Sequence, residues 1–483
     1  MKTMASQATA TVQLCRGHDH DHGHDLGLGL FQPRCLPRGR AHHLFDGMSD
    51  THRAEKVLVP SGTDWISALP DGVLGHILGF LPADEAVRTC VLSRRWLHQW
   101  KFMRCLRVTS HGVWEKSADG INKFISSLLL LRDPGAALDE VELEFTYEPS
   151  GDDRASYPNI WIRHALLRQA RALSVTLCGE YNLVFNVPPL VSRHLRKLEL
   201  SYLDFNGNVL DFSSCQFLEV LDMTECIIGT SKISSHSLKR LTMQYCSFLH
   251  DDVRTRISVP SLADLQLESF HGIAPMLETN TSLKTAFVSP CSVDERCQEG
   301  DSKECCGTCA KCCGNDDDHR NGSVLLGGLS SATHLKLITE SPGQFIFRRD
   351  LKWCPTFVKL KKLFLDDWCV EADLRALVCM LEHSPILEQL TLQLSKGPER
   401  TLEREEKYGL MEKSTYVSQN LKTVNVKCHE VDLRVSKILK FLSTFDIDIT
   451  IEQNGQIIPF EEVVTNFGLS LEVPPHDQSG VQG

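Results

Sequence analysis

A short phrase, L-x-x-L-x-L in one-letter code, recurs along this chain of 483 residues and limits the folds that the chain can adopt. Its three apolar positions are occupied in eleven units by Leu138, Val141 and Leu143; Ala172, Val175 and Leu177; Leu195, Leu198 and Leu200; Leu218, Leu221 and Met223; Leu238, Leu241 and Met243; Leu262, Leu265 and Leu267; Leu283, Ala286 and Val288; Ala332, Leu335 and Leu337; Leu360, Leu363 and Leu365; Leu387, Leu390 and Leu392; Leu421, Val424 and Val426. Apolar residues at alternate positions predict a short strand with one buried face. One such strand cannot bury that face alone, so every unit needs a similar unit beside it.

The spacing of the units indicates which repeat fold they build. Most of them begin 20 to 28 residues apart, close to the period of leucine-rich repeats. Two units also have a cysteine, Cys226 and Cys246, at the position that these repeats reserve for asparagine or cysteine, and we expect both to be structural. The pattern predicts an α/β fold over residues 108–455, a leucine-rich-repeat solenoid with a curved parallel sheet and helices on its convex side.

The residues between the leucines are expected to face away from the core of this solenoid. Examples are Glu199, Asp222, Thr242 and Gln266. A partner protein can be recognised at such positions, although solvent contact is the ordinary role of any one of them.

Residues 64–107 follow a helical period instead. Leu74, Ile77, Leu78 and Leu81 are spaced as one apolar face of a helix. Pro70 suits the first turn of that helix, where a missing N–H is no disadvantage.

Two further helices are expected in the same segment, beginning near Asp84 and Ser93, whose side chains are suited to cap a helix N-terminus. Three helices in about 44 residues have more large apolar side chains than they can cover mutually. The excess must contact either the following domain or another protein.

The residues of this segment closely resemble an F-box. The resemblance is carried by Leu69-Pro70, the stripe of Leu74, Ile77 and Leu78, Phe80-Leu81-Pro82, the run from Val91 to Trp96, and Trp100. In that family the helices bind a Skp-type adaptor, which connects the protein to a cullin ubiquitin ligase. The resemblance implies adaptor contact for Leu69, Pro70, Leu74, Ile77, Leu78, Val91, Leu92 and Trp96. For a single residue such as Leu78, the alternative is a place in the helical core only.

A second resemblance lies farther along the chain. Residues 347–369 and 374–394 are similar to the C-terminal half of the large plant F-box and leucine-rich-repeat family, related to the FBD-type group. That family implies a subunit that recruits substrates for ubiquitination. The target varies between members, so the resemblance does not identify it.

A cysteine-rich insert interrupts the repeats at residues 289–323, between the units that begin at Leu283 and Ala332. Cys306, Cys309 and Cys312 have the two-residue spacing that places thiolates on one tetrahedral ion, and His319 can complete the site. Besides this possible zinc site, we expect no cofactor. A reduced loop without metal is an alternative, and an iron–sulfur cluster is another, although the usual Cys-Pro partner is missing.

Both ends of the chain lack a packing pattern. Residues 1–63 are rich in Gly, His, Asp and Arg and are expected to form a disordered leader, with Met48 as a second possible start. Residues 456–483 are expected to form a C-terminal tail.

Composition excludes several classes of function. The net charge of -11 argues against nucleic-acid binding, which normally needs a basic surface. No apolar run is long enough to span a membrane and no secretory signal begins the chain, so we expect an intracellular protein of the nucleus, the cytoplasm or both, with mostly free thiols. No catalytic motif is present, so we expect no enzyme.

The function expected from these features is the substrate-recognition subunit of a Skp–cullin–F-box ubiquitin ligase, with the repeats binding a target protein. Two alternatives remain open at the level of sequence. One is a leucine-rich-repeat scaffold without a ligase role, and the other is an interaction protein that responds to metal or redox state through its cysteines.

Overall fold

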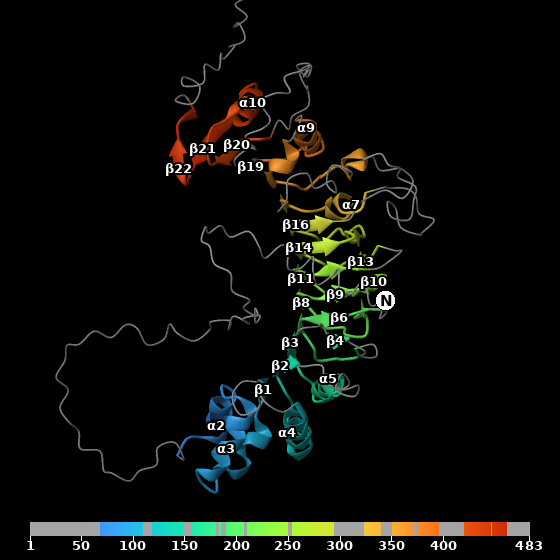
Figure 1. Ribbon diagram of the computed structural model, residues 1–483, viewed down its shortest axis with the longest axis vertical. Helices are drawn as coiled ribbons and strands as arrows, with labels where there is room; N and C mark the ends of the chain where they lie inside the picture. The colour runs from blue at the N-terminus through green and yellow to red at the C-terminus, as the bar shows by residue number, and fades with distance from the viewer. Residues whose placement is uncertain are drawn as a thin grey trace, which may run out of the picture.

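The computed structural model describes residues 68–109, 118–147, 157–179, 183–184, 190–206, 210–249, 254–293, 323–339, 350–370, 374–395, 420–445 and 447–460. Figure 1 shows an elongated solenoid with a helical bundle at its N-terminal end and helix α10 near the other end. Both ends bend toward the same side, so the long sheet lines the concave face.

The long sheet is a row of parallel strands in which each strand pairs with the next one along the row. Its strands are β1 (Cys105–Thr109), β2 (Glu140–Tyr147), β3 (Ala172–Gly179), β5 (Lys197–Ser201), β8 (Val220–Thr224), β11 (Arg240–Gln244), β14 (Asp264–Gly272), β16 (Thr285–Val293), β17 (His334–Leu337), β18 (Lys362–Asp366), β19 (Gln389–Leu394), β20 (Thr423–Cys428) and β21 (Asp448–Gln453). Strand β22 (Gln456–Ile458) pairs antiparallel to β21 and ends the row.

Burial alternates along these strands as the repeat pattern predicts. Leu221, Leu241 and Leu265 lie in register on three adjacent strands, and each is at most 1% exposed. Equivalent leucines therefore stack along the solenoid and bury one another, which confirms the predicted curved parallel sheet.

The chain turns the same corner in four successive repeats. Tyr202, Glu225, Tyr245 and Ser269 all have a positive φ, between 51° and 62°. Tyr202 donates its N–H to the carbonyl of Thr224 in the next repeat at 3.0 Å, and Glu225 and Tyr245 make equivalent bonds. This left-handed residue lets each strand bend while its backbone remains paired.

The two predicted structural cysteines lie at these corners and are buried. The thiol of Cys226 donates to the carbonyl of Leu200 at 3.4 Å, and that of Cys246 donates to the carbonyl of Met223 at 3.6 Å. Each thiol therefore contacts the preceding repeat, which explains the preference for cysteine at this position of the repeat.

The opposite side of the solenoid is built from helices at both ends and from short strands in the middle (Figure 1). The helices are α4 (Ala118–Leu131), α5 (Tyr157–Leu167), α7 (Leu326–Leu329), α9 (Arg375–Glu382) and α10 (Leu433–Leu442), with 3-10 turns η4 (Leu351–Trp353) and η5 (Asp367–Cys369). The short strands form a corner ladder, β4 (Leu183–Val184), β6 (Leu203–Asp204), β9 (Ile227–Ile228) and β12 (Ser247–Phe248), and a second sheet, β7 (Leu210–Asp211), β10 (Lys232–Ser234), β13 (Arg256–Ser258) and β15 (Met276–Leu277). A strand crosses the same width with fewer residues than a helix, which explains the shorter central repeats.

The N-terminal bundle contains α2 (Asp71–Leu78), α3 (Ala83–Arg88), and two 3-10 turns, η1 (Thr89–Val91) and η2 (Trp96–Phe102). The third predicted helix is therefore a 3-10 segment. Asp84 lies inside α3 and forms an ion pair with Arg88 at 3.4 Å, so its predicted role as a cap is wrong. Ser93 also does not cap, because η2 begins after Arg95 and has no side-chain cap.

The bundle is continuous with the solenoid. Strand β1 begins at Cys105, directly after the bundle, and α3 packs against it. The buried guanidinium of Arg132, at the end of α4, donates to the carbonyl of Met103 at 2.5 Å, and burial lowers the pKa of this arginine to about 10. Arg104 forms an ion pair with Asp139 at 2.5 Å. The two parts therefore share one core.

Two predicted boundaries need correction. Strand β16 continues to Val293 and buries Cys291, so residues 289–293 belong to the sheet and not to the cysteine-rich insert. The C-terminal tail was predicted from residue 456, but residues 456–458 form β22. Residues 294–322, the leader at 1–63 and most of the tail lie outside the described residues.

No helix in the described ranges is long and apolar enough to cross a membrane.

A buried carboxylate fixes the chain where it re-enters the solenoid after the insert. Asp350 is fully buried and accepts hydrogen bonds from the backbone N–H groups of Val324, Leu325 and Leu326, at 2.6 to 3.1 Å. It also accepts a bond from the Ser323 hydroxyl at 3.2 Å. One side chain thus satisfies the donors at the start of α7 from a segment about 25 residues away.

We predict that Asp350→Ala lowers the free energy of unfolding by about 3 kcal/mol, because it leaves several buried N–H groups without an acceptor. Asp350→Asn keeps one acceptor oxygen and is expected to cost less. Urea unfolding followed by circular dichroism measures both variants, with Glu430→Ala, an exposed carboxylate, as the control. An alanine variant as stable as the unaltered chain contradicts this role.

A second carboxylate makes stability depend on pH. Burial raises the pKa of Asp366 to about 6, although its oxygens accept bonds from the Thr339 N–H at 2.6 Å and the Trp368 N–H at 3.4 Å. The folded chain thus keeps this proton to a higher pH than the unfolded chain. The protonated carboxyl group of Asp366 therefore makes its full contribution to the free energy of unfolding below about pH 4. This contribution is lost as the pH rises through 6.

We predict that Asp366→Asn, which stays neutral, gains stability relative to the unaltered chain by up to about 3 kcal/mol between pH 4 and pH 7. Urea unfolding of both proteins at several pH values gives this difference. Glu430→Gln is the control and should show no such trend. A difference that does not change with pH would mean that Asp366 titrates normally.

Candidate protein-interaction surfaces and a thiol–imidazole cluster

The bundle presents a strip of apolar side chains along α2. Val73, Ile77 and Phe80 are 42%, 38% and 64% exposed. Val73 and Ile77 are four residues apart and share one face of α2, next to the buried face of Leu74 and Leu78, and Phe80 follows two residues after the helix ends. This strip is therefore a flank of the helix that the chain itself leaves uncovered.

A second group of exposed apolar residues follows α3. Val91 is 83% exposed, Leu92 65% and Leu97 47%. The turn η2 packs against both α2 and η1, so this group and the α2 strip belong to the same small bundle. We call the two groups together the bundle face. Large apolar residues gathered on a small domain are typical of a protein-binding surface.

Polar contacts hold the bundle face in shape. The guanidinium of Arg95 donates to Asp71 at 2.6 Å and to the carbonyl of Leu69 at 2.5 Å, and Gln99 also donates to Asp71, at 3.2 Å. These bonds connect the start of α2 with η2. The exposed residues are consequently presented on a fixed frame.

The structure separates the eight residues predicted to contact an adaptor into two classes. Pro70, Ile77, Val91 and Leu92 are exposed, and Leu69 is half-buried against the core, so their contact with an adaptor stays a prediction. For Leu74, Leu78 and Trp96 the prediction needs correction.

These three side chains are at most 4% exposed because they point into the interior of the bundle. The helical stripe in the sequence marked the inward face, whereas the accessible residues lie beside it. Leu74, Leu78 and Trp96 support the bundle face from within.

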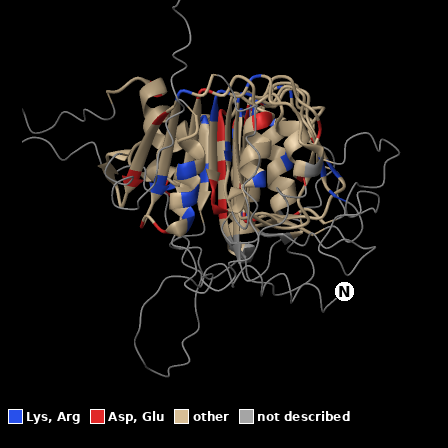
Figure 2. Ribbon diagram, turned by 90° about the horizontal axis from the view of Figure 1, so that it is seen from above, with Lys and Arg blue, Asp and Glu red and all other residues tan. Residues whose placement is uncertain are grey.

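The open face of the long sheet is the second candidate surface. Glu199, Asp222, Thr242 and Gln266 lie in one register row across four strands, and all are at least partly exposed, as predicted. Figure 2 shows acidic and basic residues on neighbouring strands of the sheet. This face is thus polar and charged, unlike the apolar bundle face.

The same row changes character in the C-terminal half. It continues through Phe287, Lys336 and Phe364, and the ammonium of Lys336 lies 4.5 Å and 4.9 Å from the centroids of the two rings. A hollow of about 390 Å³ opens over these residues, with His334 and Thr391 at its border. The cation between two aromatic rings makes this hollow distinctive on the sheet.

Sequence reasoning missed this hollow. Phe287, Lys336 and Phe364 each occupy the x position of L-x-L, so an aligned comparison of the repeats was the available signal. Because the cysteine-rich insert lies between Phe287 and Lys336 in the sequence, their adjacency in the sheet was not apparent.

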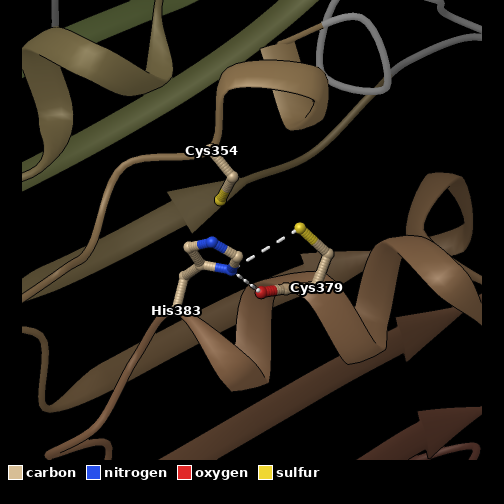
Figure 3. A group of neighbouring side chains, drawn as sticks. All are labelled: Cys354, Cys379 and His383. Atoms are coloured by element: carbon tan, nitrogen blue, oxygen red, sulfur yellow. Dashed lines mark hydrogen bonds between the residues drawn. The ribbon is translucent and has the colours of Figure 1, made fainter.

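A cluster of metal-ligand side chains lies on the convex side. Cys354 follows η4, Cys379 lies on α9, and His383 caps the C-terminal end of that helix. One ligand atom from each residue lies within 4.8 Å of the others, and all three residues are half-buried. Figure 3 shows the imidazole ring of His383 next to both sulfur atoms.

This cluster is not the metal site predicted from the sequence. Cys306, Cys309, Cys312 and His319 all lie outside the described residues. The spacing Cys379-x-x-x-His383 was a visible signal, since residues four apart share one face of a helix. The contribution of Cys354 was not visible, because only the fold brings it to α9.

Comparison with known proteins agrees with both parts of the architecture. The family model of the F-box domain matches residues 66–107. An F-box/LRR-repeat protein of Arabidopsis thaliana is 31% identical over 212 residues, which cover 43% of this chain and 39% of the relative. An F-box/FBD/LRR-repeat protein of the same plant is 24% identical over 194 residues, covering 39% of this chain and 41% of the relative.

A third similar protein is an FBD-associated F-box protein of Arabidopsis thaliana. It is 26% identical over 364 residues, which cover 69% of this chain and 76% of the relative. For the two relatives named before it, the match spans about two fifths of their length.

Proposed function

Because this chain is an F-box protein whose leucine-rich repeats resemble those of plant proteins, we propose that it is the substrate-recognition subunit of a Skp–cullin–F-box ubiquitin ligase. The F-box would bind a Skp-type adaptor and, through it, a cullin. The repeats would bind a target protein. We place this activity inside the cell, in the nucleus, the cytoplasm or both.

The observation that supports adaptor binding most directly is the bundle face. Val91 and Leu92, at 83% and 65% exposure, are more accessible than structural residues of a small domain need to be. The solenoid covers another side of the bundle, through α3 and β1, and leaves this face open. A second polypeptide is therefore the expected cover, and a docked helix would suit its size.

Ubiquitin transfer in this proposal needs no catalytic side chain from this chain. F-box proteins with leucine-rich repeats are typically non-catalytic adaptors. Their contribution is effective concentration, because holding the target in the same assembly as the charged ubiquitin carrier makes the transfer intramolecular.

The open face of the sheet is the proposed target-binding surface. The hollow around Lys336 combines two ring faces with a cation, which suits a target segment with acidic and apolar side chains. Its position in the C-terminal half keeps a bound target away from the F-box, at the other end of the solenoid (Figure 1).

We predict that Ile77→Asp and Leu92→Asp each weaken binding of a Skp-type adaptor by at least about thirtyfold, a loss of about 2 kcal/mol. Both side chains are exposed, so the new charge is tolerated in the free protein and is buried without a partner only in the complex. Calorimetric titration of the purified chain with the adaptor measures the effect.

Leu167→Asp is the matched control, since Leu167 is 69% exposed on α5, away from the bundle. It should bind the adaptor as the unaltered chain does. If the unaltered chain does not bind, or if all three variants bind equally well, the chain is a repeat scaffold without a ligase role.

We predict that Lys336→Glu reduces capture of target proteins by at least about tenfold while adaptor binding is unchanged, because it reverses the charge between two rings. Proximity labelling in cells with inhibited proteasomes, quantified by mass spectrometry, gives the set of captured proteins. Lys440→Glu, an exposed residue of α10, is the control. An identical set for both variants would exclude the hollow as the target-binding site.

A further inference from the structure

Cys379 and His383 form a chelating pair at the end of α9. They are four residues apart in the last turn, and the Cys379 sulfur lies 3.7 Å from Nδ1 of His383. A tetrahedral zinc ion has zinc–sulfur bonds of about 2.3 Å and zinc–nitrogen bonds of about 2.0 Å, which places the two ligand atoms about 3.5 Å apart. The imidazole ring thus lies beside the Cys379 sulfur, and since one ligand atom from each residue lies within 4.8 Å of the others, a modest movement brings a ring nitrogen to this spacing.

Cys354 supplies a third ligand from a different element. Its sulfur, the Cys379 sulfur and an imidazole nitrogen all lie within 4.8 Å of one another (Figure 3). Two sulfur atoms on one zinc ion are about 3.8 Å apart. Small side-chain rotations therefore suffice to bring all three ligands onto one ion.

The histidine already has a suitable orientation. Its Nδ1 lies 2.9 Å from the carbonyl oxygen of Cys379, a distance at which Nδ1–H donates to the carbonyl. In that tautomer the lone pair is on Nε2, which becomes the ligand atom. Metal-binding histidines usually hold their other ring nitrogen in such a bond, which fixes the ring.

Cysteine binds zinc as the thiolate, so binding of the ion would release the thiol protons of Cys354 and Cys379.

The remaining contacts of the two sulfurs are weak. Cys354 contacts the carbonyl of Pro355 at 3.7 Å, and Cys379 contacts that of Leu351 at 4.0 Å. Both distances are at the long end for thiol donors, so a metal ion displaces little. The cluster supplies three of the four ligands of a tetrahedral ion, so water or a side chain of another protein would supply the fourth.

We propose that Cys354, Cys379 and His383 bind one zinc ion, which connects η4 to α9 on the convex side of the solenoid. Two sulfurs and one imidazole select zinc over magnesium or calcium, which prefer oxygen ligands. The ion would strengthen the link between two segments that already touch, since the N–H of Phe357 donates to the carbonyl of His383 at 2.8 Å. This site is independent of the F-box, so it does not rest on the ligase proposal.

Cobalt titration tests the site, since thiolate ligands give cobalt a charge-transfer band that histidine ligands alone do not give. The full-length chain would carry no histidine tag and would have serine in place of the six insert cysteines, which removes the competing thiols of the insert: Cys297, Cys305, Cys306, Cys309, Cys312 and Cys313. We expect the chain to bind about one equivalent of cobalt in tetrahedral geometry and to show this band. Added zinc should displace the cobalt. Elemental analysis of the purified chain should then show the same equivalent of zinc.

Three further variants in that background decide the assignment. Cys379→Ser should abolish the band, and His383→Gln should weaken cobalt binding by at least about tenfold, as removal of a ligand does. Cys90→Ser, a half-buried thiol of the F-box, should leave both unchanged. Circular dichroism checks that each variant is folded. If Cys379→Ser is unfolded, the result for His383→Gln decides the assignment.

Two outcomes would overturn the proposal. One is a fully reduced background protein that shows no charge-transfer band with cobalt. The other is equal cobalt binding by His383→Gln and Cys90→Ser, which would place the ion at another thiol.

Discussion

The stacking of equivalent leucines between adjacent strands is the contact on which the rest of the molecule depends. Leu221, Leu241 and Leu265 show the arrangement, because each is buried only where the neighbouring repeat supplies the next leucine. The left-handed corner residues and the cysteine thiols keep successive repeats in register. The open face of the sheet follows from this arrangement, since a fixed register also fixes which side chains face outward.

The periodicity of the sequence was sufficient to predict the sheet, because burial on a strand alternates with every residue. The helical stripe of the F-box was harder to interpret, because it marks burial without saying which partner buries it. Leu74 and Ile77 lie on one stripe, yet the chain covers the first and leaves the second partly exposed. Features that join distant segments had no local signal. Asp350 at the start of α7 and Cys354 beside α9 are examples.

The two surfaces differ in chemistry in a way that suits different partners. The bundle face is rich in exposed apolar side chains, which favours a constant partner and a stable contact. The open face of the sheet mixes acidic, basic and aromatic side chains (Figure 2), which favours discrimination between partners. One chain can thus offer a surface for a constant partner at the bundle face and a more selective surface on the open face of the sheet.

The shared core of the bundle and the solenoid has a mechanical consequence. Because β1 follows η2 almost immediately and Arg132 ties α4 to Met103, no hinge separates the two parts. The molecule therefore acts as a rigid spacer, and each added strand lengthens it by about 4.8 Å. Among chains built this way, gaining or losing a repeat beyond the bundle would shift any protein bound on the sheet by that step, relative to one bound at the bundle face.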